Sequence, residues 1–234
     1  MKNEAIKTAM TFLLIAIIVS AAVFVIFTGF SGDKSASPTV SGAPMPTVII
    51  DAGHGGMDGG AVGCDGTLEK DLNLEIATTL AELLRISGYN VVMTRTEDVM
   101  LSTDDGGGSA KLRDLKKRLE IASAYPGSVT VSVHCKKFPL ESCKGLQVYH
   151  SEGETAKALA ESIQQGVKGS LQPENHRAVK QADSSIYLLS RAKTPSVLIE
   201  CGFLSNPEEC EKLNDINYRR SLSLVLLKGI TEVY

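Results

Sequence analysis

Short β-branched runs alternate with amphipathic helical stripes along most of this chain. The runs with strand character are residues 47–50, 90–94, 128–133, 146–149 and 196–199. The stripes with helical spacing are residues 68–87, 112–122, 156–167 and 218–233. Gly88 is a typical cap after the first stripe, and Asn206 followed by Pro207 predicts a further helix start. This alternation predicts an α/β fold with a mostly parallel sheet of roughly six strands and helices on both faces.

An uncharged segment precedes this region. Residues 8–30 carry no charged side chain, and as a helix they would be about 35 Å long, enough to cross a bilayer. Lys2 and Lys7 precede the segment with only Glu4 against them, so residues 1–7 are expected in the cytoplasm and the rest of the chain outside. A cleaved signal sequence is the alternative, although the apolar stretch is longer than usual and has no clear cleavage site.

The composition after the uncharged segment separates a tether from a folded domain. Residues 31–46 are mostly Ser, Gly, Ala and Pro, which is typical of a flexible linker, and residues 47–234 form the expected domain. The whole chain is 43% hydrophobic with a net charge of -3. Without a basic field to gather phosphates, it is not expected to bind nucleic acid.

Three ionisable side chains follow three predicted strands. His54 lies in a glycine-flanked turn after the first strand, His134 comes directly after residues 128–133, and Glu200 comes directly after residues 196–199. In open α/β sheets, ligands bind outside the carboxyl ends of the strands. We therefore expect these three residues to meet at one edge of the sheet.

Glu69, at the start of the first long helix, is a fourth candidate. By itself it is explained as an acidic residue that complements the helix dipole. The loop after His54 is, however, long enough to bring this helix start to the same sheet edge. Two histidines and one carboxylate with an open position form a catalytic zinc arrangement, which leaves the second carboxylate free to act as a base. The spacing is not HExxH, so a thermolysin-type site is excluded.

Other polar residues have simpler explanations. His150 and His176 have surroundings typical of a solvated surface. A basic run lies opposite a leucine stripe and is expected to form a solvated helix face. Its members are Lys111, Arg113, Lys116, Lys117 and Arg118.

The five cysteines form no CxxC pair, which argues against a structural zinc knot. Their odd number leaves at least one thiol unpaired within the chain. Cys135 and Cys201 each follow a candidate site residue, and because neighbours on a strand face opposite sides, both are expected in the core. A loop disulfide between Cys135 and Cys143 is conceivable.

Five separated segments carry a family resemblance. They read VIIDAGHGGMDGGAVG, GTLEKDLNLEIA, GYNVVMTRTED, VSVHC and PSVLIECGFLSNPEE. Together they resemble the zinc-dependent N-acetylmuramoyl-L-alanine amidases of the amidase-3 family, over about residues 48–234. The membrane-spanning start, the segment PENHR and the ending ECGFLSNPEE are most similar to the spore-cortex branch, the CwlD type of germination-specific amidase.

The resemblance implies roles for the four candidate residues. His54, Glu69 and His134 would bind one Zn²⁺ per chain, and Glu200 would be the catalytic carboxylate. The implied substrate is peptidoglycan, cleaved at the amide between the lactyl group of N-acetylmuramic acid and L-alanine of the stem peptide. In the spore cortex this cleavage would precede muramic δ-lactam formation, which is needed for germination, and the catalytic domain would act in the spore intermembrane or cortex space.

One segment departs from the family pattern. The family usually carries an Asn within two residues of the second histidine, whereas this chain reads His134, Cys135 and Lys136. The departure leaves the metal ligands intact, but the resemblance then no longer defines substrate positioning or catalytic strength, because this loop would line the groove for the peptide. Since some members of the spore-cortex branch depend on a lipoprotein for full activity, an activating lipoprotein partner is a hypothesis here.

Two other classes of protein remain open from the sequence. One is a non-catalytic peptidoglycan-binding module, although all four polar positions are present. The other is a different zinc peptidase acting on stem peptides, which would need a group for the substrate's terminal carboxylate. The candidate arginines for that role are Arg95, Arg118 and Arg177.

Overall fold

The computed structural model describes residues 45–102 and 109–234. The chain divides into two units, Met1–Pro44 and Met45–Tyr234, and the fold described below is that of the second unit. The expected cytoplasmic start, the uncharged span at residues 8–30 and nearly all of the tether lie outside the described residues. Within the described ranges, no helix is both long and apolar enough to span a membrane.

The domain is built on a six-stranded sheet with the strand order β2-β1-β3-β6-β4-β5. The strands are β1 (Thr47–Ala52), β2 (Asn90–Met93), β3 (Val129–Lys136), β4 (Gln147–His150), β5 (Lys180–Gln181) and β6 (Ser196–Phe203). Strands β2, β1, β3 and β6 are mutually parallel, while β4 is antiparallel to β6 and parallel to β5. The predicted mostly parallel α/β sheet is confirmed.

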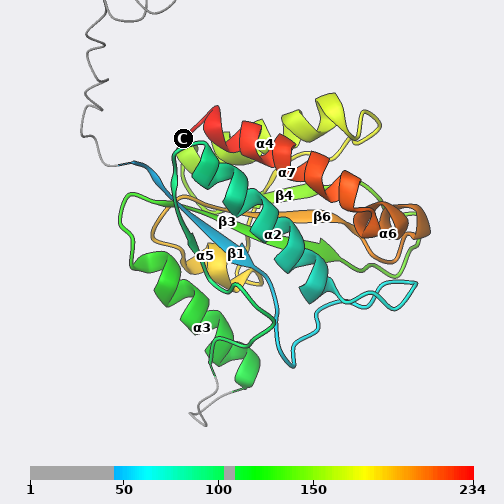
Figure 1. Cartoon of the computed structure of the whole chain (residues 1–234), viewed down its shortest axis with the longest axis horizontal. Helices are drawn as coiled ribbons and strands as arrows, with labels where there is room; N and C mark the ends of the chain where they lie inside the picture. Colours follow the sequence, from blue (N-terminus) through cyan, green and yellow to red (C-terminus); the bar gives the residue numbers. More distant parts are fainter. Residues whose placement is uncertain (1–44, 103–108) are drawn as a thin grey trace, which may run out of the picture. The chain divides into compact units, whose positions relative to one another are not determined.

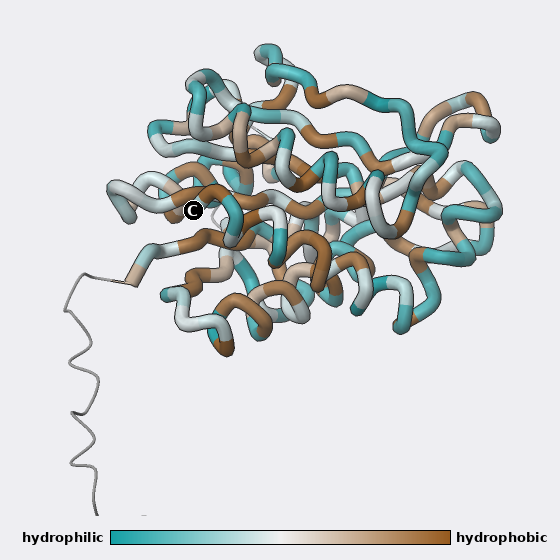
Figure 2. The backbone as a smooth tube through the Cα atoms, turned by 90° about the horizontal axis from the view of Figure 1, so that it is seen from above, coloured by the Kyte–Doolittle hydropathy of each residue, from teal (hydrophilic) through white to brown (hydrophobic). Residues whose placement is uncertain are grey.

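Helices cover both faces of this sheet. They are α2 (Glu69–Ile86), α3 (Ala110–Ser123), α4 (Glu154–Ser170), α5 (Tyr187–Arg191), α6 (Pro207–Asn214) and α7 (Ile216–Thr231). Helices α2, α4 and α7 pack on one face, where α7 contacts both α2 and α4, and α3 and α5 pack on the other (Figure 1). Figure 2 shows hydrophobic segments through the middle of the domain and hydrophilic segments in its outer loops.

Strand alternation assigns polar residues to one face. Val131 and Val133 of β3 point into the core shared with α2, α4 and α7. Thr130, Ser132 and His134 therefore point to the face covered by α3 and α5, since successive side chains alternate. The strands also run further than predicted, because β3 and β6 continue through His134 and Glu200 rather than ending before them.

Helix starts and ends follow the expected cap residues. The side chain of Asn206 accepts a hydrogen bond from the backbone N–H of Glu209, and Pro207 occupies the first turn of α6, as predicted. Gly88 has a φ of 90° just after α2, a conformation that ends a helix and that glycine adopts without strain. Two short elements, β5 and α5, were not predicted.

Candidate functional site

Three predicted metal ligands meet at the carboxyl ends of β1 and β3. One potential ligand atom from each of His54, Glu69 and His134 lies within 4.8 Å of the others. His54 Nε2 is 3.2 Å and His134 Nδ1 is 3.0 Å from the same carboxylate oxygen, Oε1 of Glu69. These residues come from three separate segments, so the fold rather than a local motif assembles the cluster.

Backbone groups hold the carboxylate of Glu69 in place. The N–H of Ala61 donates to Oε2 at 2.8 Å, and the N–H of Cys135 donates to Oε1 at 3.1 Å. Glu69 is only 4% exposed, although it begins α2. Its orientation is thus fixed by the loop before α2 and by β3, which means that its role exceeds that of a helix-dipole residue.

His54 is oriented by a second carboxylate. It has a φ of 61°, a conformation that is unusual for a residue other than glycine and is often found at functional sites. Its Nδ1 lies 2.9 Å from Oδ2 of Asp58, so Nε2 is the nitrogen that faces Glu69. A carboxylate behind a ligand histidine fixes its tautomer and ring orientation, as in many metal sites.

The charges within the cluster shift its pKa values. Burial favours the neutral form of Glu69, but hydrogen bonds with His134 and His54 outweigh it and hold the pKa of Glu69 far below its usual range. Burial likewise opposes the charged form of His54, yet the hydrogen bonds with Glu69 and Asp58 raise the pKa of His54. Glu69 is therefore an ionised carboxylate that lies between two imidazoles, and its negative charge favours a cation at this position.

Glu200 lies beside the cluster on β6. It is paired in register with His134 of β3, and its side chain is 15% exposed. Its Oε1 is 4.0 Å from the Nζ of Lys136, whereas its buried Oε2 has no hydrogen-bond partner among the described residues. Burial is the largest influence and raises the pKa of Glu200, although His134 and Lys136 oppose it. A raised pKa makes a carboxylate a stronger proton acceptor, which suits it to general acid–base chemistry.

A cavity of about 230 Å³ gives access to this region. His54, His134 and Glu200 line it on the sheet side, and Leu115 of α3 and Tyr187 of α5 line it on the helix side. Both candidate histidine ligands and the candidate catalytic carboxylate therefore face one space, on the polar face of β3.

Arg118 is buried next to this cavity, where it binds the lining residues Asp51 and Asp114. The prediction that the whole basic run forms a solvated helix face is therefore wrong for Arg118. It is only 2% exposed and pairs with Asp51 at 2.6 Å and Asp114 at 2.7 Å. Its guanidinium also donates to the backbone oxygens of Ala52 at 2.6 Å and His54 at 2.5 Å. Arg118 thus connects α3 to the end of β1 and to the turn that carries His54.

The other arginines and histidines lie elsewhere. Arg95 is buried and donates to the backbone oxygens at positions 52 and 53, and Arg177 lies over the ring of Phe203. None of Arg95, Arg118 and Arg177 lines the cavity beside the cluster. His150 is 7% exposed, so its assignment to the solvated surface was wrong, whereas His176 is exposed as predicted.

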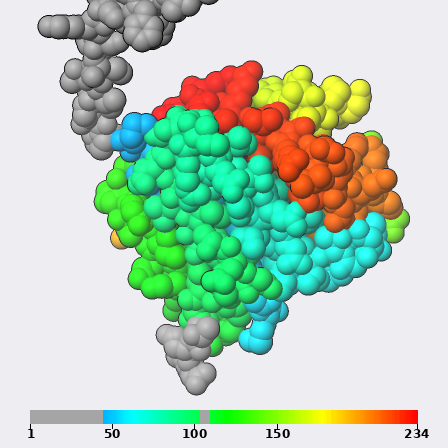
Figure 3. Space-filling view, viewed as in Figure 1, coloured from blue at the N-terminus to red at the C-terminus, as the bar shows by residue number. Residues whose placement is uncertain are grey.

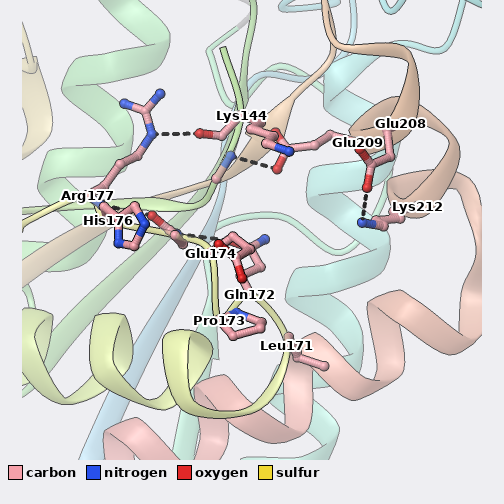
Figure 4. A pocket seen from close by; sticks show the side chains of 12 residues that line it. Lys144, Leu171, Gln172, Pro173, Glu174, His176, Arg177, Glu208, Glu209 and Lys212 are labelled. Atoms are coloured by element: carbon pink, nitrogen blue, oxygen red, sulfur yellow. Dashed lines mark hydrogen bonds and ion pairs between the residues drawn. The ribbon is translucent and has the colours of Figure 1, made fainter. Parts of the chain in front are cut away.

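A second and larger cavity, of about 510 Å³, lies between the loop before β5 and α6 (Figure 4). None of the four predicted site residues lines it. Several of its charged groups bind one another or the backbone: Lys212 pairs with Glu208, and Glu209 accepts a hydrogen bond from the backbone N–H of Gly145. The chemistry that the sequence predicts therefore belongs to the smaller cavity.

Sequence reasoning missed two residues that orient His54. Asp58 follows His54 by four positions in a glycine-rich turn, and that short spacing was the available signal. Arg118 falls between Leu115 and Leu119 on the apolar stripe of α3, so its helical position indicated burial. Its distant partner Asp51 could not be identified from local spacing.

The fold and this cluster define a class: an open α/β domain with a His, Glu and His cluster beside a buried carboxylate, as expected of a metal-dependent hydrolase. The family model described as N-acetylmuramoyl-L-alanine amidase matches residues 48–232. The chain belongs to this amidase family.

Several known proteins are similar to the chain. The germination-specific N-acetylmuramoyl-L-alanine amidase of Bacillus subtilis is 31% identical, over 88% of this chain and 86% of that protein. The uncharacterized protein YqiI of the same organism is 35% identical, over 80% of this chain and 84% of that protein. The CwlD amidase of Clostridioides difficile, solved in complex with the GerS lipoprotein, is 38% identical with a TM-score of 0.76, covering 80% of this chain and 98% of that one.

Proposed function

We propose that this protein is a zinc-dependent amidase of peptidoglycan. It hydrolyses the amide between the lactyl group of N-acetylmuramic acid and L-alanine of the stem peptide. The observation that carries this proposal is the common cavity of His54, His134 and Glu200, with Glu69 bridging the two histidines beneath it. Membership of the amidase family supplies the substrate class.

The donor set fits one zinc ion. Two imidazole nitrogens and one carboxylate oxygen within 4.8 Å of one another match a catalytic zinc site that keeps a position open for water or substrate. When bound, zinc would act as a Lewis acid and make water a nucleophile near neutral pH. His54, Glu69 and His134 would hold the ion, and Asp58 would keep the His54 ring oriented.

Glu200 moves the proton in this mechanism. Its buried carboxylate accepts a proton from the attacking water and then donates it to the departing amine of L-alanine. The raised pKa of Glu200, caused mainly by burial, suits a group that must both accept and donate a proton. The charge of Lys136, 4.0 Å away, limits that rise, so the carboxyl group remains able to act as a base.

The biological setting follows from the relatives. The similarity to a germination-specific amidase and to the CwlD amidase supports a role in germination. In this role the chain would act in spore cortex maturation, where removal of the stem peptide precedes muramic δ-lactam formation. We place the catalytic domain outside the cytoplasmic membrane, in the spore intermembrane or cortex space. Residues 8–30 would anchor it or act as its signal sequence.

A lipoprotein partner is part of the proposal. The CwlD structure contains the GerS lipoprotein, and the present chain carries Cys135 and Lys136 where the family usually has an Asn. A partner that binds the folded domain would raise activity or zinc retention. Equal amidase rates with and without a co-expressed lipoprotein would remove this part of the proposal.

Product analysis tests the reaction itself. The full-length chain is incubated with intact peptidoglycan, and the soluble products are identified by mass spectrometry. An amidase releases the intact stem peptide with a free L-alanine amine, whereas a carboxypeptidase releases a terminal D-amino acid. The second result would favour the zinc peptidase alternative, and zinc-independent binding without products would favour the binding module.

A further inference from the structure

Cys64 lies in a tight loop that packs against α6. Within the loop, the N–H of Gly63 donates to the oxygen of Thr67 at 2.8 Å. The N–H of Cys64 donates to the oxygen of Leu204 at 3.1 Å, which ties the loop to the segment between β6 and α6. Cys64 itself is exposed.

Side chains of α6 hold the same loop. Asn214 Nδ2 donates to Asp65 Oδ2 at 2.9 Å and to Thr67 Oγ1 at 3.0 Å. The Sγ of Cys210 donates to Asp65 Oδ1 at 3.2 Å. In Figure 3 the cyan segment that contains this loop lies directly against the orange segment that contains α6. Residues far apart in sequence are therefore held at one place by several polar contacts.

The thiols of Cys64 and Cys210 are neighbours in this interface. A Cβ added at Gly63 would lie 2.9 Å from the Sγ of Cys210, so that sulfur rests against the backbone just before Cys64. Asp65, just after Cys64, accepts its hydrogen bond. The Cys64 thiol is also near enough to Cys210 to contribute to the raised pKa of Cys210. Contacts on both sides of Cys64 thus place the sulfur of Cys210 beside the backbone that carries the Cys64 side chain.

We propose that Cys64 and Cys210 form a disulfide that fastens the loop at residues 63–67 to α6. Nothing in the amidase reaction requires this bond. It depends on the extracytoplasmic location proposed above, where disulfides persist, and not on the amidase activity. The loop continues through Leu68 directly into Glu69, so the disulfide would brace the segment that leads to this proposed zinc ligand.

The bond forms by exchange with an external disulfide, either of low molecular weight or of a thiol oxidoreductase. The exposed Cys64 thiolate attacks one external sulfur, forms a mixed disulfide and releases one external thiol. Cys210 then attacks the sulfur of Cys64, and its proton leaves with the second external thiol. Two protein thiols are oxidised, and one external disulfide is reduced to two thiols.

The environment of Cys210 sets the order of these steps. Cys210 is 2% exposed, and burial, together with its hydrogen bond to Asp65 and the nearby Cys64 thiol, raises the pKa of Cys210 to about 12. A protonated, buried thiol is a poor first nucleophile. All five cysteines are free in the structure, Cys64 and Cys210 included. The thiols of Cys135 and Cys201 also interact, but both are buried in the core, where an external disulfide cannot reach them. A bond between Cys135 and Cys143 would likewise need the buried Cys135 thiol.

Disulfide mapping of the full-length chain tests the proposal. The protein is treated with oxidised glutathione, its remaining thiols are blocked, and unreduced peptides are analysed by mass spectrometry. The expected product is a linked pair of peptides containing Cys64 and Cys210. A persistent glutathione adduct on Cys64, or a different cysteine pair, would overturn the proposal.

Thermal unfolding supplies a second readout. The oxidised protein should melt about 5–15 °C above the dithiothreitol-reduced protein, because the bond closes a long loop of the unfolded chain. Cys64→Ser changes an exposed residue, should still fold, and should abolish the difference, whereas the control Cys143→Ser should keep it. An unchanged melting temperature on oxidation of the wild-type chain would contradict the proposal, and neither readout depends on amidase activity.

Discussion

His134 of β3 and Glu200 of β6 stand opposite each other in the register of two adjacent parallel strands. Both side chains line one cavity, and one belongs to the proposed zinc site while the other is the proposed catalytic carboxylate. Interior strands are more rigid than loops, so the distance between ligand and catalytic group is fixed by backbone hydrogen bonding. The precision of the site therefore originates in the sheet itself.

Gly60 is required for the close packing around Glu69. A Cβ at this position would lie 2.6 Å from Oε2 of Glu69 and 2.8 Å from the His54 ring. Gly60→Ala should displace the carboxylate and reduce zinc affinity by at least about tenfold. Zinc affinity is measured by competition with a chromogenic chelator.

Gly66→Ala is the matched control for this change. Both glycines have positive φ, 68° for Gly60 and 92° for Gly66, but a Cβ at Gly66 would meet nothing within 4 Å. Each variant should lose about 1–2 kcal/mol of stability from backbone strain, whereas only Gly60→Ala should lose zinc affinity. Equal zinc affinities in the two variants would show that the contact with Glu69 is unimportant.

Arg118 should be essential for stability despite its position in a basic run. Arg118→Met leaves Asp51 and Asp114 without the cation that they share, and a broken buried ion pair costs about 3–5 kcal/mol. Lys117→Met is the control on the same helix, since Lys117 is 44% exposed, and its change should stay within about 0.5 kcal/mol. Urea unfolding measures the free energy of unfolding of both variants. A similarly small loss of stability in the two would contradict a stabilising role for the buried ion pairs of Arg118.

The lowered pKa of Asp51 predicts that the folded domain loses stability in acid. Burial raises its pKa, but the charge of Arg118 and other partners outweigh burial and lower the pKa of Asp51 from 3.8 to about 2. Because the folded-state pKa is depressed, the stabilisation is complete above pH 3.8 and is lost as the pH falls towards 2. The loss should amount to about 2 kcal/mol in urea unfolding across this range. Asp51→Asn should flatten the pH dependence, and an unchanged slope would contradict the assignment.

Asp58 should tune the zinc site without binding the ion. Asp58→Asn removes the charge behind Nδ1 of His54, and changes of this kind weaken metal affinity by about 10–100-fold. Asp71→Asn, at an exposed position in the first turn of α2, should leave the affinity unchanged. Equal affinities would mean that Asp58 does not orient the ligand.

Much of the fold could be predicted because its signals are local. The alternating runs gave the parallel core of the sheet, and cap residues such as Asn206 and Gly88 marked helix ends. Strand β5 has two exposed residues and α5 has five residues, so neither carries a periodic signal. Strand β4 reads as an ordinary strand, and its reversed direction depends on tertiary pairing with β6.

The site was predictable to the extent that strands deliver residues to one edge. His134 and Glu200 follow apolar runs, and their meeting required only that neighbouring strands be parallel. The ion pairs beneath the site depend on packing between distant segments, which is why the burial of Arg118 against Asp51 was missed. His150 was misassigned for a similar reason, because its burial depends on the tertiary environment of β4.

The most direct test compares Glu200→Gln with His54→Ala in the full-length chain, with zinc content and release of stem peptides from peptidoglycan measured on the same preparations. Glu200→Gln should retain about one zinc ion per chain, as proposed for the wild type, and lose at least about 10²-fold in rate. His54→Ala should lose both zinc and activity, because it removes a ligand. Equal zinc loss in the two variants, or an active Glu200→Gln protein, would contradict the division between zinc ligands and proton-transfer residue.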